Sequence, residues 1–118
     1  MKTLEELGFE LRHIGINCVN ESEADAVAQS FDDIFGFQKK TGNSSVFAGT
    51  AVEAMKEPYL GEKGHIAVGT TDVAAAVAYL EEKGVKFNAD SAKYKEEKLI
   101  AIYLEQEIGG FAVHLVQK

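Results

Sequence analysis

Residues 11–18 read LRHIGINC and residues 64–69 read GHIAVG, so the motif HIGI at positions 13–16 returns as HIAV at positions 65–68. Both stretches are rich in aliphatic residues and alternate along the chain, which is typical of strands. Because a motif that recurs at this separation indicates an internal duplication, the chain is predicted to contain two copies of one structural unit.

The first copy continues from its strand into a helix and three short extended segments. Residues 23–35 carry apolar side chains at the three- and four-residue spacing of an amphipathic helix, after helix-start residues at 20–22. Gly36 is expected to end this helix. Turn residues then separate extended segments at residues 37–40, 44–48 and 51–56, which favours an antiparallel meander.

The second copy repeats this order after a linker at residues 57–64, which holds the one proline of the chain. A strand at 64–69 leads into a helix that is capped by Thr71 or Asp72 and ends at Gly84. The remaining segments are an extended piece at 85–88, a polar stretch at 89–97, and strands at 99–104 and 111–117. The predicted fold is therefore α+β, with a lead-in at residues 1–10 and βαβββ repeats at residues 11–56 and 65–118 in one domain.

The composition is that of a globular domain with an acidic surface. Of the 118 residues, 46% are hydrophobic and 26% are charged, and the formal net charge is −7. Since such a surface repels phosphate backbones and anionic lipids, we expect no nucleic acid and no membrane as a partner. A cytoplasmic location is expected, because the sequence shows no basic and apolar leader and no apolar run of membrane-spanning length.

Two further expectations concern packing. Cys18, the only cysteine, is interpreted as a small buried residue rather than a reactive thiol. Neither repeat can bury the inner face of its sheet alone, so the repeats must pack together or against another subunit. A homodimer is expected because exposed sheet edges in small domains are usually covered.

The three histidines of the chain occupy matching positions in the two repeats. His13 and His65 lie at the same place in the first strand of each repeat. His114 lies in the last strand of the second repeat, within VHLV at 113–116, and Glu53 is its counterpart in VEAM at 52–55. Four candidate ligands therefore form two equivalent pairs.

Strand alternation indicates that these four side chains share one face. In each of the four strands the candidate ligand shares its face with small residues such as Gly15 and Ala67, whereas the other face is bulky and apolar. The apolar face suits packing on the helices. The opposite, concave face would have room for a metal ion and a small molecule.

Three imidazoles and one carboxylate suit a divalent first-row metal, and nickel, zinc, manganese and iron all remain open. His13, Glu53, His65 and His114 are therefore the predicted metal ligands. A buried histidine with an ordinary packing role is the alternative for any one of them, but a buried Glu53 without a cation would be costly.

The HIGI and HIAV strands, the βαβββ duplication and the closing VHLVQ resemble the vicinal oxygen chelate superfamily, which includes glyoxalases, extradiol dioxygenases, epimerases and bleomycin-resistance proteins. The resemblance covers residues 11–118. It implies a cup-shaped sheet with helices on its outer face and a ligand from the first and last strand of each repeat, at the four positions above. His114 stands where the family more often has glutamate, and residues 105–110 replace its common Asp-Pro-Asp-Gly turn.

The segments HIGINC, GNSSVFAGT and EIGGFAVHLVQK are also similar to a module labelled keto-hydroxyglutarate/keto-deoxy-phosphogluconate aldolase in some Gram-positive bacteria. Aldolases of that name are (β/α)₈ barrels with a Schiff-base lysine. Because this chain has neither the length nor the βα alternation of such a barrel, the resemblance implies a metabolic context and not that chemistry.

The functional hypothesis is a metal-dependent lyase or isomerase that acts on a small 2-oxo or 2-hydroxy acid. The metal would chelate two adjacent oxygens of the substrate, and Glu53 would serve either as the catalytic base or as a plain ligand. Arg12 and Tyr103 could either polarise the substrate or lie on the surface, and the sequence leaves both roles open. The lysines at 93, 95 and 98 are expected in a solvated hairpin. The alternative is a non-catalytic module of the same fold that binds a small molecule or accompanies a sugar-acid enzyme.

Overall fold

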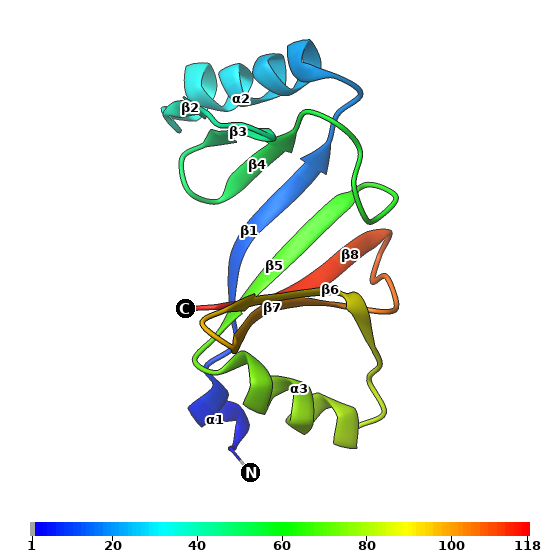
Figure 1. The fold of residues 1–118 in the computed structure, drawn as a ribbon. Helices are drawn as coiled ribbons and strands as arrows, with labels where there is room; N and C mark the ends of the chain where they lie inside the picture. The colour runs from blue at the N-terminus through cyan, green and yellow to red at the C-terminus, as the bar shows by residue number, and fades with distance from the viewer. Residues whose placement is uncertain (1) are drawn as a thin grey trace.

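A mixed sheet of eight strands forms the body of the molecule, as Figure 1 shows for the computed structural model, which describes residues 2–118. The strands follow the order β2-β3-β4-β1-β5-β8-β7-β6 across the sheet. The predicted α+β class with two βαβββ repeats is confirmed. The elements are α1 Leu4–Leu7, β1 Glu10–Asn17, α2 Glu21–Phe35, β2 Lys39–Thr41, β3 Ser45–Ala48, β4 Val52–Met55, β5 Gly64–Thr70, α3 Val73–Glu82, β6 Phe87–Lys95, β7 Lys98–Leu104 and β8 Phe111–Gln117.

Helix α2 begins and ends at the residue types that the sequence indicates, whereas α3 begins at Asp72 as predicted but has Lys83 as its C-cap, one residue before the predicted Gly84. Asn20 accepts a hydrogen bond from the Glu23 backbone at 2.8 Å, and Asp72 caps α3 in the same way through Ala75. Gly36 ends α2 in the left-handed conformation, at φ 74°. A residue with a Cβ would be strained there, which explains why the helix stops at a glycine.

The two repeats meet through the antiparallel pairing of β1 with β5, at the middle of the strand order. Figure 1 shows α2 at one end of the molecule and α3 at the other, each beside its own half of the sheet. Each half therefore has its own core. The first core gathers Cys18, Ala24, Ala28, Val46, Ala48 and Ala54. The second gathers Leu7, Val73, Ala76, Ile102 and Leu115.

Strand β6 differs from the prediction, because residues 87–95 form one strand where a short extended piece and a polar stretch were expected. β6 is an edge strand, so polar side chains can face water on its exposed parts. The pairing of β6 with β7 is irregular between Asn88 and Lys93, and the Ser91 side chain supplies hydrogen bonds there. The Ser91 hydroxyl donates to the Asn88 carbonyl at 2.6 Å and accepts from the Tyr103 backbone at 2.9 Å.

The lead-in packs against the second half of the molecule. Leu7, at the end of α1, is fully buried in the second core, and its carbonyl accepts hydrogen bonds from the Thr70 hydroxyl at 2.7 Å and the Thr71 backbone at 3.0 Å. None of the helices within residues 2–118 combines the length and the apolar character needed to span a membrane. The expected homodimer stays a prediction.

Replacing Leu7 by alanine is expected to lower the free energy of unfolding by about 2–5 kcal/mol, because it opens a cavity in the second core. Leu4 on the same helix is 53% exposed, so Leu4→Ala serves as the matched control and should change stability by less than about 1 kcal/mol. Urea denaturation followed by circular dichroism measures both values. Equal losses in the two variants would show that α1 does not anchor the core.

Candidate metal centre

The four candidate ligands come from four neighbouring strands at the centre of the sheet, β4, β1, β5 and β8. Gly15 is paired with Glu53 on one side and with His65 on the other. Ala67 is paired in the same way with His13 and with His114. Because paired residues point to the same face, the ligands lie in two adjacent rows on one face of the sheet.

Three of the four side chains meet at hydrogen-bond distance. The Nε2 atoms of His13 and His65 are 3.2 Å apart, and the Glu53 Oε1 atom lies 3.1 Å from His65 Nε2 and 3.4 Å from His13 Nε2. The side chain of His65 is 4% exposed, whereas those of His13 and Glu53 are 20% and 16% exposed. The cluster is therefore mostly dry but keeps a side that water and small molecules can reach.

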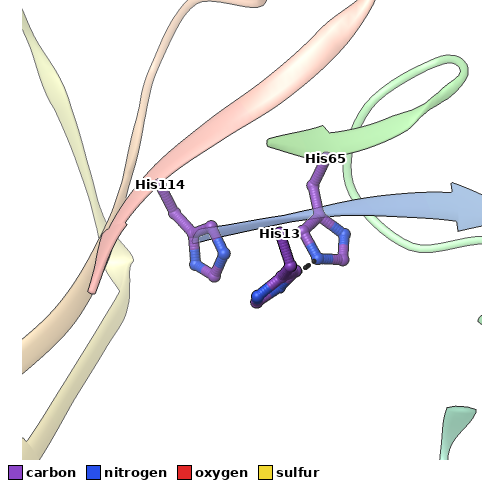
Figure 2. Close-up of side chains that lie close together, drawn as sticks. All are labelled: His13, His65 and His114. Atoms are coloured by element: carbon purple, nitrogen blue, oxygen red, sulfur yellow. Dashed lines mark hydrogen bonds between the residues drawn. The ribbon is translucent and has the colours of Figure 1, made fainter. Parts of the chain in front are cut away.

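His114 completes the group from β8, and Figure 2 shows its imidazole turned toward the other two histidines. One ring nitrogen from each of His13, His65 and His114 lies within 4.8 Å of the others. The His114 ring stacks on Tyr103, with 4.3 Å between ring centroids and 13° between planes. Its Nε2 atom is buried and has no hydrogen-bond partner among the described residues, as is also true of His65 Nδ1.

This arrangement fits a divalent cation. Ligand atoms bound at about 2.0–2.2 Å to one ion lie about 3.0–3.5 Å from one another, which matches the separations among His13, His65 and Glu53. A proton on one histidine Nε2 atom can form a hydrogen bond with only one of the other two atoms. A cation, in contrast, would accept lone pairs from His13 Nε2, His65 Nε2 and Glu53 Oε1 at once. The Nε2 atom of His114, which has no hydrogen-bond partner among the described residues, could bind such an ion as a further ligand.

Ser45 holds the carboxylate of Glu53 from the other side. The Ser45 hydroxyl, in β3, donates to Glu53 Oε2 at 2.7 Å, which leaves Oε1 for the histidines. Burial raises the pKa of Glu53, but the hydrogen bonds from His13, His65 and Ser45 outweigh it and hold the pKa well below its usual range. Glu53 is therefore ionised near neutral pH, as a metal ligand must be.

The pKa values of His114 and Tyr103 are also shifted by their burial in this cluster. Burial, together with the charges of His65 and His13, lowers the pKa of His114 to about 3, so its imidazole is neutral near pH 7. Burial also raises the pKa of Tyr103 well above its ordinary value, so the phenol keeps its proton. The centre thus combines an ionised carboxylate, a neutral imidazole and a neutral phenol that can donate a hydrogen bond.

Gly15 is needed for His65 to adopt this position. A Cβ atom at Gly15 would lie only 2.0 Å from the His65 ring, so any larger residue would displace the imidazole. The small residues on this face were expected to leave room for a metal and a substrate. At Gly15 the room is filled by a ligand side chain.

Three contributions around the centre were not assigned from the sequence. Ser45 carries no motif, and only its place beside β4 in the folded sheet identifies it as a partner of Glu53. Tyr103 was left open, although its pairing with His114 in the meander could have placed it on the inner face. Asn17 fixes the linker: its amide donates to the Gly61 carbonyl at 2.9 Å, and its oxygen accepts from the Tyr59 backbone at 3.1 Å.

The chain has the fold of the vicinal oxygen chelate superfamily. Its structure resembles a methylmalonyl-CoA epimerase variant of Streptomyces coelicolor in complex with 2-nitronate-propionyl-CoA, at a TM-score of 0.63 and 21% identity over 92% of this chain and 94% of that one. It also resembles the methylmalonyl-CoA epimerase of Mycobacterium tuberculosis, at a TM-score of 0.60 and 16% identity over 99% of this chain and 92% of that one.

A hypothetical protein from Bacillus halodurans C-125 is a third structural neighbour, at a TM-score of 0.63 and 17% identity over 94% of this chain and 95% of that one. No protein-family model and no curated protein sequence matches the chain. At these identities the neighbours establish the fold that the resemblance implied. They lend no support to the aldolase-labelled module or to a lyase.

The depressed pKa of His114 predicts a pH-dependent stability of the metal-free protein. A histidine in an unfolded chain has a pKa of about 6.5. Between this pH and about 3, the unfolded chain therefore binds more protons at His114 than the folded protein does. The free energy of unfolding should therefore fall as pH falls, by up to about 1.4 kcal/mol per pH unit from His114. Urea denaturation between pH 7 and pH 5 in the presence of EDTA measures this slope.

His114→Phe is the matched comparison for that slope, because phenylalanine can keep the stacking on Tyr103 without taking up a proton. The variant should show a shallower decline of stability between pH 7 and pH 5 than the parent protein. Identical slopes in the two proteins would mean that His114 is not held neutral in the folded state.

Proposed function

We propose that this chain binds a divalent first-row metal ion through His13, Glu53, His65 and His114, and that it is an isomerase acting on a small 2-oxo or 2-hydroxy acid. The convergence of the three imidazoles and the Glu53 carboxylate carries the proposal. These donor types suit nickel, zinc, manganese or iron. Four protein ligands would leave a coordination position open for substrate if the ion is five- or six-coordinate.

The metal would supply Lewis-acid polarisation of a chelated carbonyl and so make a neighbouring C–H bond more acidic. The residues around it have separate tasks. His13 and Glu53, on the more accessible side, border the place where a substrate would enter. Tyr103 keeps His114 in its orientation by stacking, and its protonated hydroxyl can donate a hydrogen bond toward a substrate oxygen.

Glu53 is the one carboxylate in the cluster and therefore the candidate for moving the proton. The Oε2 atom of Glu53 accepts a hydrogen bond from Ser45 and the pKa of Glu53 is low, which suits a ligand better than a base. For Glu53 to remove a proton, it would have to leave the metal and be desolvated beside the substrate, which would raise its pKa. An isomerisation requires only that the proton leave one face of the carbon and that a proton return, with no net oxidation.

The fold neighbours favour an isomerase over a lyase, since several of them are named as epimerases. Two of the neighbouring epimerase structures are described with acyl-CoA compounds, 2-nitronate-propionyl-CoA and methylmalonyl-CoA. A cavity of about 530 Å³ beyond Met55 and Tyr59 offers little for coenzyme A phosphates, because Glu21 and Glu57 line it and its Lys56 already contacts Glu21 at 3.5 Å. This charge pattern disfavours coenzyme A phosphates in that cavity.

The low pKa of Glu53 also favours a second candidate function, a module that binds a small molecule at the same metal without turning it over. A carboxylate that is stabilised in its ionised form is a weak base. The two functions share the metal site and differ only in whether a proton is exchanged.

Metal binding is tested on protein that has been stripped with a chelator and titrated with nickel, zinc, manganese and ferrous ions by calorimetry. We expect at least one of these ions to bind with one-to-one stoichiometry. His114→Ala should weaken that binding by at least about a hundredfold, because it removes a ligand nitrogen. Glu57→Gln, at an exposed carboxylate outside the cluster, is the control and should leave the affinity unchanged. A protein that binds none of the four ions would refute the proposal.

Proton transfer is tested by incubating the metal-loaded protein with 2-oxobutyrate in D₂O and following loss of the C3 proton signal by NMR. We expect faster exchange than with metal and buffer alone, and Glu53→Gln should reduce the rate by at least about a hundredfold. Methylmalonyl-CoA in a parallel sample tests the substrate of the fold neighbours. Binding without exchange of either compound would favour the non-catalytic module.

A further inference from the structure

Strand β1 contains an irregularity directly beside the metal centre. Leu11 is paired with Val68 and His13 is paired with Ala67, so two steps along β1 correspond to one step along β5. Arg12 is the extra residue of this β-bulge. A bulge turns a side chain away from the face that simple alternation would give it, and bulges are frequent next to active sites.

The surroundings of Gly69 show where Arg12 points. Gly69 follows His65 and Ala67 by alternation, so a Cβ atom there would point to the face that carries the metal ligands. Such an atom would lie 2.7 Å from Arg12 Cγ and 2.8 Å from Arg12 Cδ. The stem of Arg12 therefore runs over Gly69 on the inner face. Strict alternation from His13 would have placed it on the outer face.

Lys93 reaches the same face from the opposite side of the sheet. It is paired with Ala101, and Ala101 is paired with Val116, which follows His114 by two residues in β8. All three therefore share the face of His114. Its neighbour Ala92 packs against the second core, on the other face of β6, which agrees with this placement of Lys93.

Arg12 and Lys93 thus flank one row of the inner face, which contains Gly69, Val116 and Ala101 and in which Glu10 is paired with Gly69 at the β1 end. This row lies two residues along the strands from the row of His114, a separation of about 6.5 Å. Lys118 also borders it, since its Cγ atom lies 3.3 Å from a Cβ placed at Gly69. Three cations and the single carboxylate of Glu10 thus gather beside the metal centre, which makes this a cationic row on a chain whose formal net charge is −7.

The partners of these cations hold them loosely. Arg12, the only arginine of the chain, contacts Glu10 at 3.5 Å, and Lys118 contacts the same carboxylate at 3.5 Å. The side chains of Arg12 and Glu10 are 48% and 54% exposed, so this pair contributes little to stability. The guanidinium can therefore exchange Glu10 for a ligand anion at small cost.

We propose that Arg12 and Lys93 form a subsite for a second anionic group of the substrate, so that the preferred ligand is a 2-oxo or 2-hydroxy acid with a distal carboxylate or phosphate. This inference rests on the proposed function, because the first carboxylate is taken to be held at the metal. A carbon chain of about five atoms spans the separation between the two rows. The planar guanidinium of Arg12 suits either distal group, since both accept two parallel hydrogen bonds.

The test compares three ligands of the metal-loaded protein by calorimetry. 2-Oxoglutarate carries a distal carboxylate, 2-oxo-4-phosphonobutanoate carries a distal phosphonate, and 2-oxovalerate has the same carbon chain as 2-oxoglutarate without the second anion. We expect at least one of the two dianions to bind about tenfold or more tightly than 2-oxovalerate, and the better one identifies the distal group. Equal affinities of all three ligands for the parent protein would overturn the proposal without any variant.

The variants R12Q and K93Q, and the double variant, assign the effect to these residues. The double variant should bind the dianions no more tightly than 2-oxovalerate, with its affinity for 2-oxovalerate unchanged. K83Q makes the same charge change at the C-cap of α3, beside the outer face, and should keep the preference. A double variant that retains the preference would overturn the proposal.

A protein that binds no metal would refute the proposed function and not yet this subsite. The subsite is then judged on the metal-free protein with inorganic phosphate, by NMR shifts of the backbone amides of Arg12 and Lys93. Saturable shifts that are present in the parent protein and in K83Q, and lost in the double variant, support the subsite. Shifts that are absent, or that persist in the double variant, reject it.

Discussion

The antiparallel pairing of β1 with β5 is the contact on which the rest of the structure depends. Each repeat has its own helix and its own small core, and within residues 2–118 no helix bridges the two cores. The ladder between these strands therefore converts two incomplete halves into one sheet. It also places the ligand-bearing strands β4, β1, β5 and β8 next to one another, since each repeat pairs its own last strand with its own first strand.

The register of this pairing determines whether the four candidate ligands can meet. With Gly15 opposite His65, the His65 imidazole lies over a residue that has no side chain, and it reaches both His13 and Glu53. A slip of one residue would bring a β-branched side chain opposite His65 and would reverse the faces of one repeat relative to the other. The anchoring of Leu7 by Thr70 and Thr71 helps to exclude such a slip, because it ties the segment before β1 to the end of β5.

The duplication predicted the fold and the grouping of the four ligands, because a repeated register and a period of two are both visible in a linear sequence. Contacts that depend on the relative positions of distant strands were not visible. Ser45 supports Glu53 only because β3 pairs with β4, and Ser91 supports Tyr103 only through an irregular edge pairing. The bulge at Arg12 is the most informative case: alternation from His13 assigns that residue to the outer face, and one inserted residue in the ladder reverses the assignment.

The two ends of the inner face, taken along the strand direction, differ in chemical character. This difference restricts how a ligand can lie on the face. Beyond Glu53 and His65 the face is bordered by Tyr59, whose ring lies 6.0 Å from that of Tyr103. Beyond His13 and His114 it is bordered by the cationic row. Because the chain as a whole carries a formal net charge of −7, a local group of cations gives an anionic ligand a preferred place on this face, which favours a single orientation. A 2-oxo or 2-hydroxy acid that carries a second anion would therefore bind in one direction, with its chelating oxygens over the histidines and its distal anion toward the cationic row, so that the bulge in β1 would select the ligand as much as the metal ligands do.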